Sequence, residues 1–144
     1  FIMSDKCSVR DWTSGRFSAN IIESMAIAVK DVAHNMPIVL IGYSGGAMVS
    51  GLIIQNYPDI NVQKWVTVAG VLNHSEWTEY FGDKPLSKSL NLNGLPVVNQ
   101  VHYVGTRDKI VPVSLSQKWV ESKNLIILEN CSHSDFENLQ IDFD

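Results

Sequence analysis

The sequence predicts an α/β fold with a parallel sheet of about four strands flanked by helices. Short, continuous apolar runs lack the alternation of a half-exposed strand, which suits strands covered on both faces. Segments with apolar residues at helical spacing alternate with these runs, as in parallel α/β proteins. Ligands of such sheets bind beyond the carboxyl ends of the strands, so the residues that follow each strand are the candidates for a functional site.

The N-terminal part is expected to be a loop followed by a helix. Residues 1–16 show no sustained period and predict a loop. A helix is expected to begin near Ser18 or Asn20, because Asn20 and Glu23 form a cap-like pair three residues apart. Pro37 ends it. Its apolar stripe consists of Ile22, Met25, Val29 and Val32.

The rest of the chain continues the alternation of strands and helices. Strands are expected at residues 38–41, 65–69, 97–104 and 125–128, and helices at 47–57, 113–122 and from 135 to 140. Residues 71–96 predict a loop with one short helix. Their apolar side chains either cover the sheet or offer surface to an acyl or aromatic group of a ligand. These side chains are Trp77, Tyr80, Phe81 and Leu86.

The first strand runs into the segment Gly42-Tyr43-Ser44-Gly45-Gly46, which satisfies G-x-S-x-G. Between a strand and a helix, this motif predicts a sharp turn that exposes a nucleophilic serine, here Ser44. A side chain at Gly42 or Gly46 is expected to clash across the turn. The Gly45 N–H would then point at a developing oxyanion. The alternative is a glycine-rich phosphate-binding turn, but the P-loop lysine and the three-glycine dinucleotide pattern are missing.

An aspartate follows the third strand at a position suited to a catalytic role. Asp108 lies three residues after Gly105, which ends that strand. An aspartate there can orient a histidine and stabilise its imidazolium. Taken alone, Asp108 would be read as a turn residue or as a cap of the next helix.

His133 is the candidate general base, because it lies in a short polar loop just after the fourth strand. His34 lies at a helix end and is interpreted as structural. His102 lies inside a strand and is expected in the core. His74 follows the second strand and is the main rival, as a residue that could line the pocket.

The resulting chain order is Ser44, Asp108, His133, the order expected of alpha/beta hydrolases. The chain resembles that superfamily in residues 42–46, 105–112 and 131–133. It resembles a group of poorly characterised bacterial alpha/beta hydrolases over nearly its whole length. That narrower likeness lies in residues 12–18, 68–70, 77–78 and 85–91, besides the G-x-S-x-G segment.

The resemblance implies serine-hydrolase chemistry on a carboxylic ester or related acyl bond of a small molecule. Ser44, Asp108 and His133 would be the catalytic residues, Gly45 the oxyanion donor, and no metal or organic cofactor is expected. Tyr43, His74 and Trp77 are the candidates for the substrate pocket. The G-x-S-x-G segment is also similar to those of lipases and thioesterases, so it does not separate these classes.

The sequence departs from the superfamily in the number of strands. A complete sheet has eight, and the four expected here correspond to the last four. Residues 1–144 are therefore expected to form a single domain that is incomplete at its N-terminus. The first strand would expose an apolar edge, and the loop that normally supplies a second oxyanion donor would be missing.

Two further expectations follow from this departure. The chain would associate with a missing N-terminal half or with a second copy of itself. The alternative function is a catalytically impaired fragment, or a non-catalytic interaction module that keeps the hydrolase fold.

Composition excludes several other classes of protein. The 144 residues carry a net charge of −4, which gives no reason to expect nucleic acid or an anionic membrane as a partner. No apolar run has the length of a membrane span. The two cysteines, Cys7 and Cys131, allow at most one disulfide, and Cys131 with His133 lacks the second ligand pair of a zinc site. No targeting signal is recognised, so a bacterial cytoplasm and a cell envelope both stay open as locations.

Overall fold

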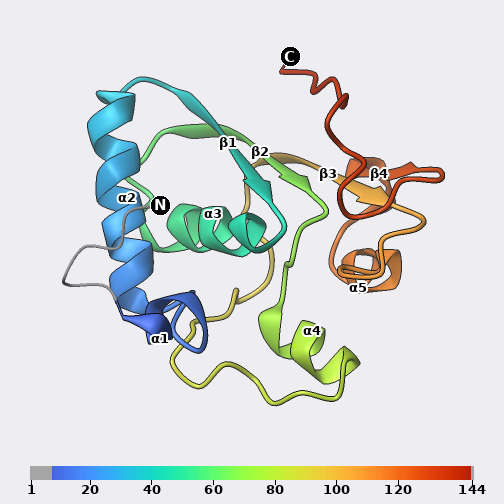
Figure 1. The fold of residues 1–144 in the computed structure, drawn as a ribbon. Coiled ribbons are helices and arrows are strands. Elements are labelled where there is room, and N and C mark those ends of the chain that lie inside the picture. Colours follow the sequence, from blue (N-terminus) through green and yellow to red (C-terminus); the bar gives the residue numbers. More distant parts are fainter. Residues whose placement is uncertain (1–7, 144) are drawn as a thin grey trace.

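The computed structural model describes residues 8–143, in which four strands form one parallel sheet in the order β1-β2-β3-β4 (Figure 1). The strands are β1 (Ile38–Tyr43), β2 (Val62–Val68), β3 (Asn99–Gly105) and β4 (Leu125–Leu128). The helices are α1 (Val9–Trp12), α2 (Ala19–Ala33), α3 (Gly45–Asn56), α4 (His74–Tyr80) and α5 (Val113–Gln117), with the short 3-10 helix η1 (Ser122–Asn124) before β4. The predicted fold class, a parallel sheet of four strands flanked by helices, is confirmed.

Two helix boundaries at the N-terminal end differ from the prediction. The short helix α1 forms where only a loop was expected. Ser18, not Asn20, caps α2, because the Ile21 N–H donates to Ser18 Oγ at 3.5 Å. Of the two starting points that the sequence left open, the structure therefore selects Ser18.

Two predicted helices in the C-terminal part are also different. The helix expected over residues 113–122 ends at Gln117, where the backbone N–H groups of Trp119 and Val120 both donate to the Ser116 carbonyl and close a turn. The helix expected over 135–140 does not form, and residues 133–138 make turns. The Asp135 carboxylate accepts the Ser132 N–H at 2.8 Å and so stabilises the turn that precedes it.

The larger core lies between the sheet and the helices on one of its faces. Helix α3 packs against β1 and β2, and α2 packs against α3 (Figure 1). Trp65 of β2 is fully buried in this core, and its indole N–H donates to Ser50 Oγ of α3 at 2.8 Å. A Cβ added at Gly51 would lie 3.0 Å from the Trp65 ring, so the small residue in α3 makes room for the indole.

The opposite face of the sheet has a smaller core that irregular chain covers. Buried Val66, Val68 and Tyr103 form its centre. The apolar side chains packed onto them from the C-terminal segment are Phe136, Leu139 and Ile141. The C-terminal segment therefore covers the second face of the sheet, as helices cover the first.

Strand β1 lies at one edge of the sheet. Among the described residues it pairs with β2 alone, so its other edge carries unpaired backbone groups, as the sequence predicted. An apolar groove runs between this edge and α2, lined by residues that include Val39 and Leu40 of β1 and Val32 and Met36 near the end of α2. Val32 is 80% exposed and Met36 is 64% exposed. The groove therefore leaves apolar side chains exposed beside this edge of the sheet.

His102 is buried in β3 and takes part in a closed hydrogen-bond network, as the sequence predicted. Its Nδ1 lies 2.7 Å from Thr67 Oγ1, and its Nε2 lies 2.9 Å from Gln100 Oε1. The Gln100 amide nitrogen donates to the carbonyls of Pro96 and Val98, which fixes Oε1 as the atom facing His102. The imidazole is therefore neutral with its proton on Nε2, and its Nδ1 accepts from the Thr67 hydroxyl. Burial lowers the pKa of His102 to about 4.

We predict that His102 makes the protein less stable as the pH falls from about 6.5 to 4. In this window the unfolded chain protonates the histidine while the folded chain does not, so the free energy of unfolding decreases with falling pH. The whole loss is up to about 3 kcal/mol, since each pKa unit corresponds to about 1.4 kcal/mol. Urea unfolding at several pH values should show a shallower pH dependence for His102→Gln than for the wild type. The exposed His34, changed to Gln, serves as control, and equal slopes for wild type and His102→Gln would contradict the prediction.

Candidate active site

Ser44 stands at the junction of β1 and α3 in a strained backbone conformation. Its φ of 52° and ψ of −121° lie in a region that residues with side chains rarely occupy. A Cβ at Gly42 would lie 2.5 Å from the Gly46 carbonyl oxygen, so the turn is too tight for a side chain there. A Cβ at Gly46 meets nothing within 4 Å. The predicted clash is thus confirmed for Gly42 and wrong for Gly46, because the latter points to solvent from the first turn of α3.

Backbone hydrogen bonds hold this strained turn. The Ser44 N–H donates to the Val68 carbonyl at 2.9 Å, and the Ser44 carbonyl accepts the N–H of Val71 at 3.0 Å. Gly45 is the first residue of α3, so its N–H has no acceptor within the helix and is free to meet a ligand. The turn therefore presents a hydroxyl and a backbone donor side by side at a helix N-terminus.

We predict that Gly42→Ala destabilises the protein and Gly46→Ala does not. The first change forces a methyl group against backbone and should lower the free energy of unfolding by about 3 kcal/mol or more. The second adds a methyl group in open space within a helix, where alanine is favoured over glycine by up to about 1 kcal/mol. Thermal and urea unfolding of the two variants checks this, and similar stabilities for both would be inconsistent with the tight turn.

Asp108 is buried in the loop between β3 and α5, with its carboxylate fully engaged. Its Oδ1 accepts the backbone N–H groups of Ile110 and Val111, both at 2.8 Å. Its Oδ2 lies 2.8 Å from His133 Nδ1. The loop thus folds around the carboxylate and leaves one oxygen for the histidine.

His133 bridges Asp108 and Ser44. A carboxylate oxygen accepts but does not donate, so Nδ1 carries the proton that is shared with Asp108. The unprotonated Nε2 then faces Ser44 Oγ at 3.1 Å. The imidazole is therefore held in the tautomer that can accept the proton of the Ser44 hydroxyl. Three residues from three strand ends form one continuous chain of hydrogen bonds.

Gly105 allows the loop that carries Asp108 and the loop that carries His133 to come close together. A Cβ at this position would overlap the Cys131 carbonyl oxygen. The Cys131 carbonyl also accepts the N–H of Arg107 at 2.9 Å. The segment before His133 is thereby fastened to the segment before Asp108. The sequence shows that a glycine ends the third strand, but it does not show that the glycine contacts Cys131.

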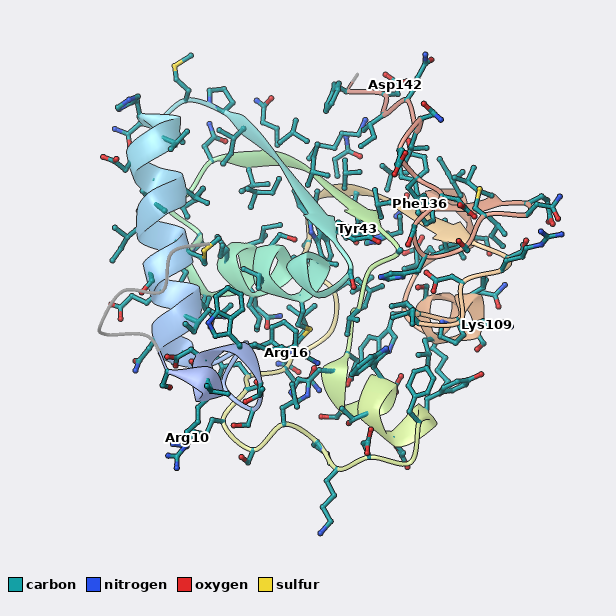
Figure 2. All side chains as sticks on the ribbon, viewed as in Figure 1. Arg10, Arg16, Tyr43, Lys109, Phe136 and Asp142 are labelled. Carbon is teal, nitrogen blue, oxygen red and sulfur yellow. The ribbon has the colours of Figure 1, made fainter. Side chains whose placement is uncertain are left out.

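Tyr43, expected in the substrate pocket, contacts His133. Its hydroxyl donates to the His133 carbonyl at 2.6 Å, and the two rings lie 5.2 Å apart. Tyr43 is half exposed at the end of β1 (Figure 2). The tyrosine thus helps to position the histidine loop, which the sequence did not indicate.

The other two pocket candidates differ in accessibility. Trp77 of α4 is partly exposed, and its indole N–H donates to the Ile110 carbonyl at 2.7 Å, which ties α4 to the Asp108 loop. His74 is only 2% exposed. Burial is the main cause that lowers the pKa of His74, and the charge of Arg16 lowers it further. The side chain of His74 therefore lies beneath the surface that Trp77 helps to form.

The described residues contain neither a cluster of metal ligands nor a helix that could span a membrane. Within residues 8–143, no three histidine, cysteine, aspartate or glutamate side chains gather as metal ligands would. None of the helices described is both long and apolar enough to cross a membrane. Cys7, the partner considered for Cys131, lies outside the described residues.

Solved structures of alpha/beta hydrolases share this fold. An alpha/beta hydrolase enzyme from the metagenome of lagoon sediments at Mar Chica, Morocco, is 15% identical with a TM-score of 0.59, and the match covers 80% of this chain and 62% of that one. An esterase from Pyrococcus furiosus is 18% identical with a TM-score of 0.58, covering 82% and 55% of the two chains. An alpha-beta serine hydrolase homologue from Coxiella burnetii is 17% identical with a TM-score of 0.57, covering 80% and 51%.

These likenesses define the class of fold. The chain has the alpha/beta-hydrolase fold, and it spans between half and two thirds of the length of these structures. No family model matches the sequence, and no curated protein does.

Proposed function

We propose that the chain acts as a serine hydrolase that cleaves a carboxylic ester or related acyl bond. The observation that carries the proposal is the unbroken series of contacts from Asp108 through His133 to Ser44, with Ser44 at a strained strand–helix turn. A neutral serine is a weak nucleophile, and an adjacent histidine base is what activates it. The fold, shared with esterases and other hydrolases, supports the same reaction class.

The mechanism follows from the protonation pattern of the three residues. His133 Nε2 takes the proton of Ser44 as Oγ attacks the carbonyl carbon of the ester, and Asp108 stabilises the imidazolium. The N–H of Gly45 donates to the oxyanion of the tetrahedral intermediate. The imidazolium returns its proton to the leaving alcohol, which leaves an acyl group on Ser44. Water, activated by the same imidazole, then releases the acid.

We predict that a fluorophosphonate probe labels the chain on Ser44 and that Ser44→Ala abolishes the labelling. The probe reacts only with a serine that a base has activated. Mass spectrometry of the labelled peptide gives the site, with the Ser24→Ala variant as control because Ser24 is exposed on α2. Absence of labelling, or labelling that persists in Ser44→Ala, would favour a non-catalytic module with the hydrolase fold.

We predict that Tyr43→Phe lowers kcat for a short p-nitrophenyl ester by about fivefold. The change removes the hydrogen bond to the His133 carbonyl, and one such bond contributes about 1 kcal/mol. KM should change less than kcat, since the loss acts on the position of the base. Tyr57→Phe, at the far end of α3, is the matched control. A normal kcat in Tyr43→Phe would show that the tyrosine does not hold the catalytic histidine.

A further inference from the structure

Among the described residues, Arg16 is a cation without an anionic partner, packed against two aromatic rings. Its guanidinium lies over the ring of Phe17, with 5.2 Å between the guanidinium carbon and the ring centroid. The same carbon lies 5.4 Å from the centroid of the Trp77 ring. No carboxylate of residues 8–143 forms a salt bridge with it. Its Nε is buried without a hydrogen-bond acceptor.

Both aromatic neighbours of Arg16 contact segments that carry candidate site residues. A Cβ at Gly45, the candidate oxyanion donor, would lie 3.5 Å from the Phe17 ring. Trp77 donates to the Ile110 carbonyl in the loop that folds around Asp108. The guanidinium therefore lies between Phe17, which reaches Gly45 at the start of α3, and Trp77 of α4, as the place of Arg16 in Figure 2 agrees.

The segment that carries Arg16 is fixed by hydrogen bonds. The Phe17 N–H donates to Ser89 Oγ at 3.2 Å, and the Ser89 hydroxyl donates to the Ser14 carbonyl at 2.9 Å. The Leu90 N–H donates to the Phe17 carbonyl at 2.8 Å. The backbone that carries the cation is thus fixed, and the two aromatic rings lie against its guanidinium, which reduces the entropy lost on binding.

The surroundings of Arg16 favour a single negative charge. A guanidinium stays charged, and a partly buried cation without a partner is unfavourable. Two aromatic faces offset only part of this, since each such contact contributes about 0.5–2 kcal/mol. The neighbouring buried histidine, His74, has an Nδ1 without a hydrogen-bond partner and no negative charge to offer. A carboxylate matches the planar fork of a guanidinium and its single charge.

We propose that Arg16 anchors a carboxylate of the substrate, so that the preferred esters are those that carry a carboxylate group. This proposal rests on the proposed function, because it assigns the substrate class of the same site. Trp77, which is partly exposed, would form an apolar wall beside the bound group, while Phe17, only 2% exposed, packs against the guanidinium. Arg16 would contact the substrate away from the reacting carbonyl, so its contribution should appear mainly in KM.

Kinetics on matched esters test the proposal. Mono-p-nitrophenyl glutarate is compared with p-nitrophenyl pentanoate to place the carboxylate on the acyl side. Phenyl butyrate is compared with 4-carboxyphenyl butyrate to place it on the leaving group. Arg16→Gln should lower kcat/KM for one of the anionic esters by about tenfold or more, because hydrogen bonds to charged groups contribute about 1.5–3 kcal/mol. The neutral esters should change less than about twofold.

Two further variants separate the charge of Arg16 from its packing. Arg10→Gln is the matched control, because Arg10 projects outward from α1 (Figure 2) and is exposed. It should leave both ester classes unchanged. Arg16→Lys should keep part of the preference, since it retains the charge but loses the planar fork. An equal effect of Arg16→Gln on anionic and neutral esters would overturn the proposal and assign Arg16 a packing role.

A binding measurement tests the carboxylate site of Arg16 whether or not the protein hydrolyses esters. Glutarate and benzoate are titrated into the Ser44→Ala protein, with the indole N–H signal of Trp77 followed by NMR. Saturable shifts that disappear in Arg16→Gln but persist with Arg10→Gln support the anion site even if no ester is hydrolysed. Absence of saturable binding by either carboxylate, together with equal kinetics on both ester classes or no hydrolysis at all, overturns it.

Discussion

The strained conformation of Ser44 is the constraint on which the described site depends. The serine keeps a positive φ because its own N–H and carbonyl are bonded to Val68 and Val71. These bonds come from the end of β2 and the residues after it, so the pairing of β1 with β2 fixes the turn as well as the sheet. Because Gly42 has no side chain, the first turn of α3 can lie directly against it. Strain of this kind persists only where the surrounding structure enforces it.

The loops after β3 and β4 complete the arrangement through backbone contacts more than through side chains. Asp108 draws the N–H groups of Ile110 and Val111 around its carboxylate, while Gly105 allows the carbonyl of Cys131 to come close. His133 is then held by Asp108 on one side and by the Tyr43 hydroxyl on its carbonyl. The Asp108 carboxylate is held by its own loop, whereas the Gly105–Cys131, Asp108–His133 and Tyr43–His133 contacts join segments far apart in sequence. Together they position one imidazole within hydrogen-bond distance of Ser44.

The region around α4 adds the features that would select a substrate. Trp77 ties α4 to the Asp108 loop, and Phe17 brings the N-terminal segment against Gly45. Between these two rings lies a guanidinium without a carboxylate partner among the described residues. The chemistry at Ser44 and the charge at Arg16 therefore belong to one surface, although opposite ends of the described chain contribute to it. This combination is what the proposal of a carboxylate-bearing ester substrate rests on.

The sequence by itself determined the fold class and the order of the four strands, and it indicated Ser44, Asp108 and His133 as the candidate site. Apolar runs without alternation predicted the strands, and G-x-S-x-G after the first of them predicted the turn at Ser44, because these signals are local. The tertiary structure alone decided that Gly46 points to solvent, that Tyr43 contacts the histidine loop, and that irregular chain covers the second face of the sheet. It also brought Arg16 beside Trp77. Such contacts join residues that are distant along the chain, and no local pattern of apolar and polar residues records which distant segment will fill a given space.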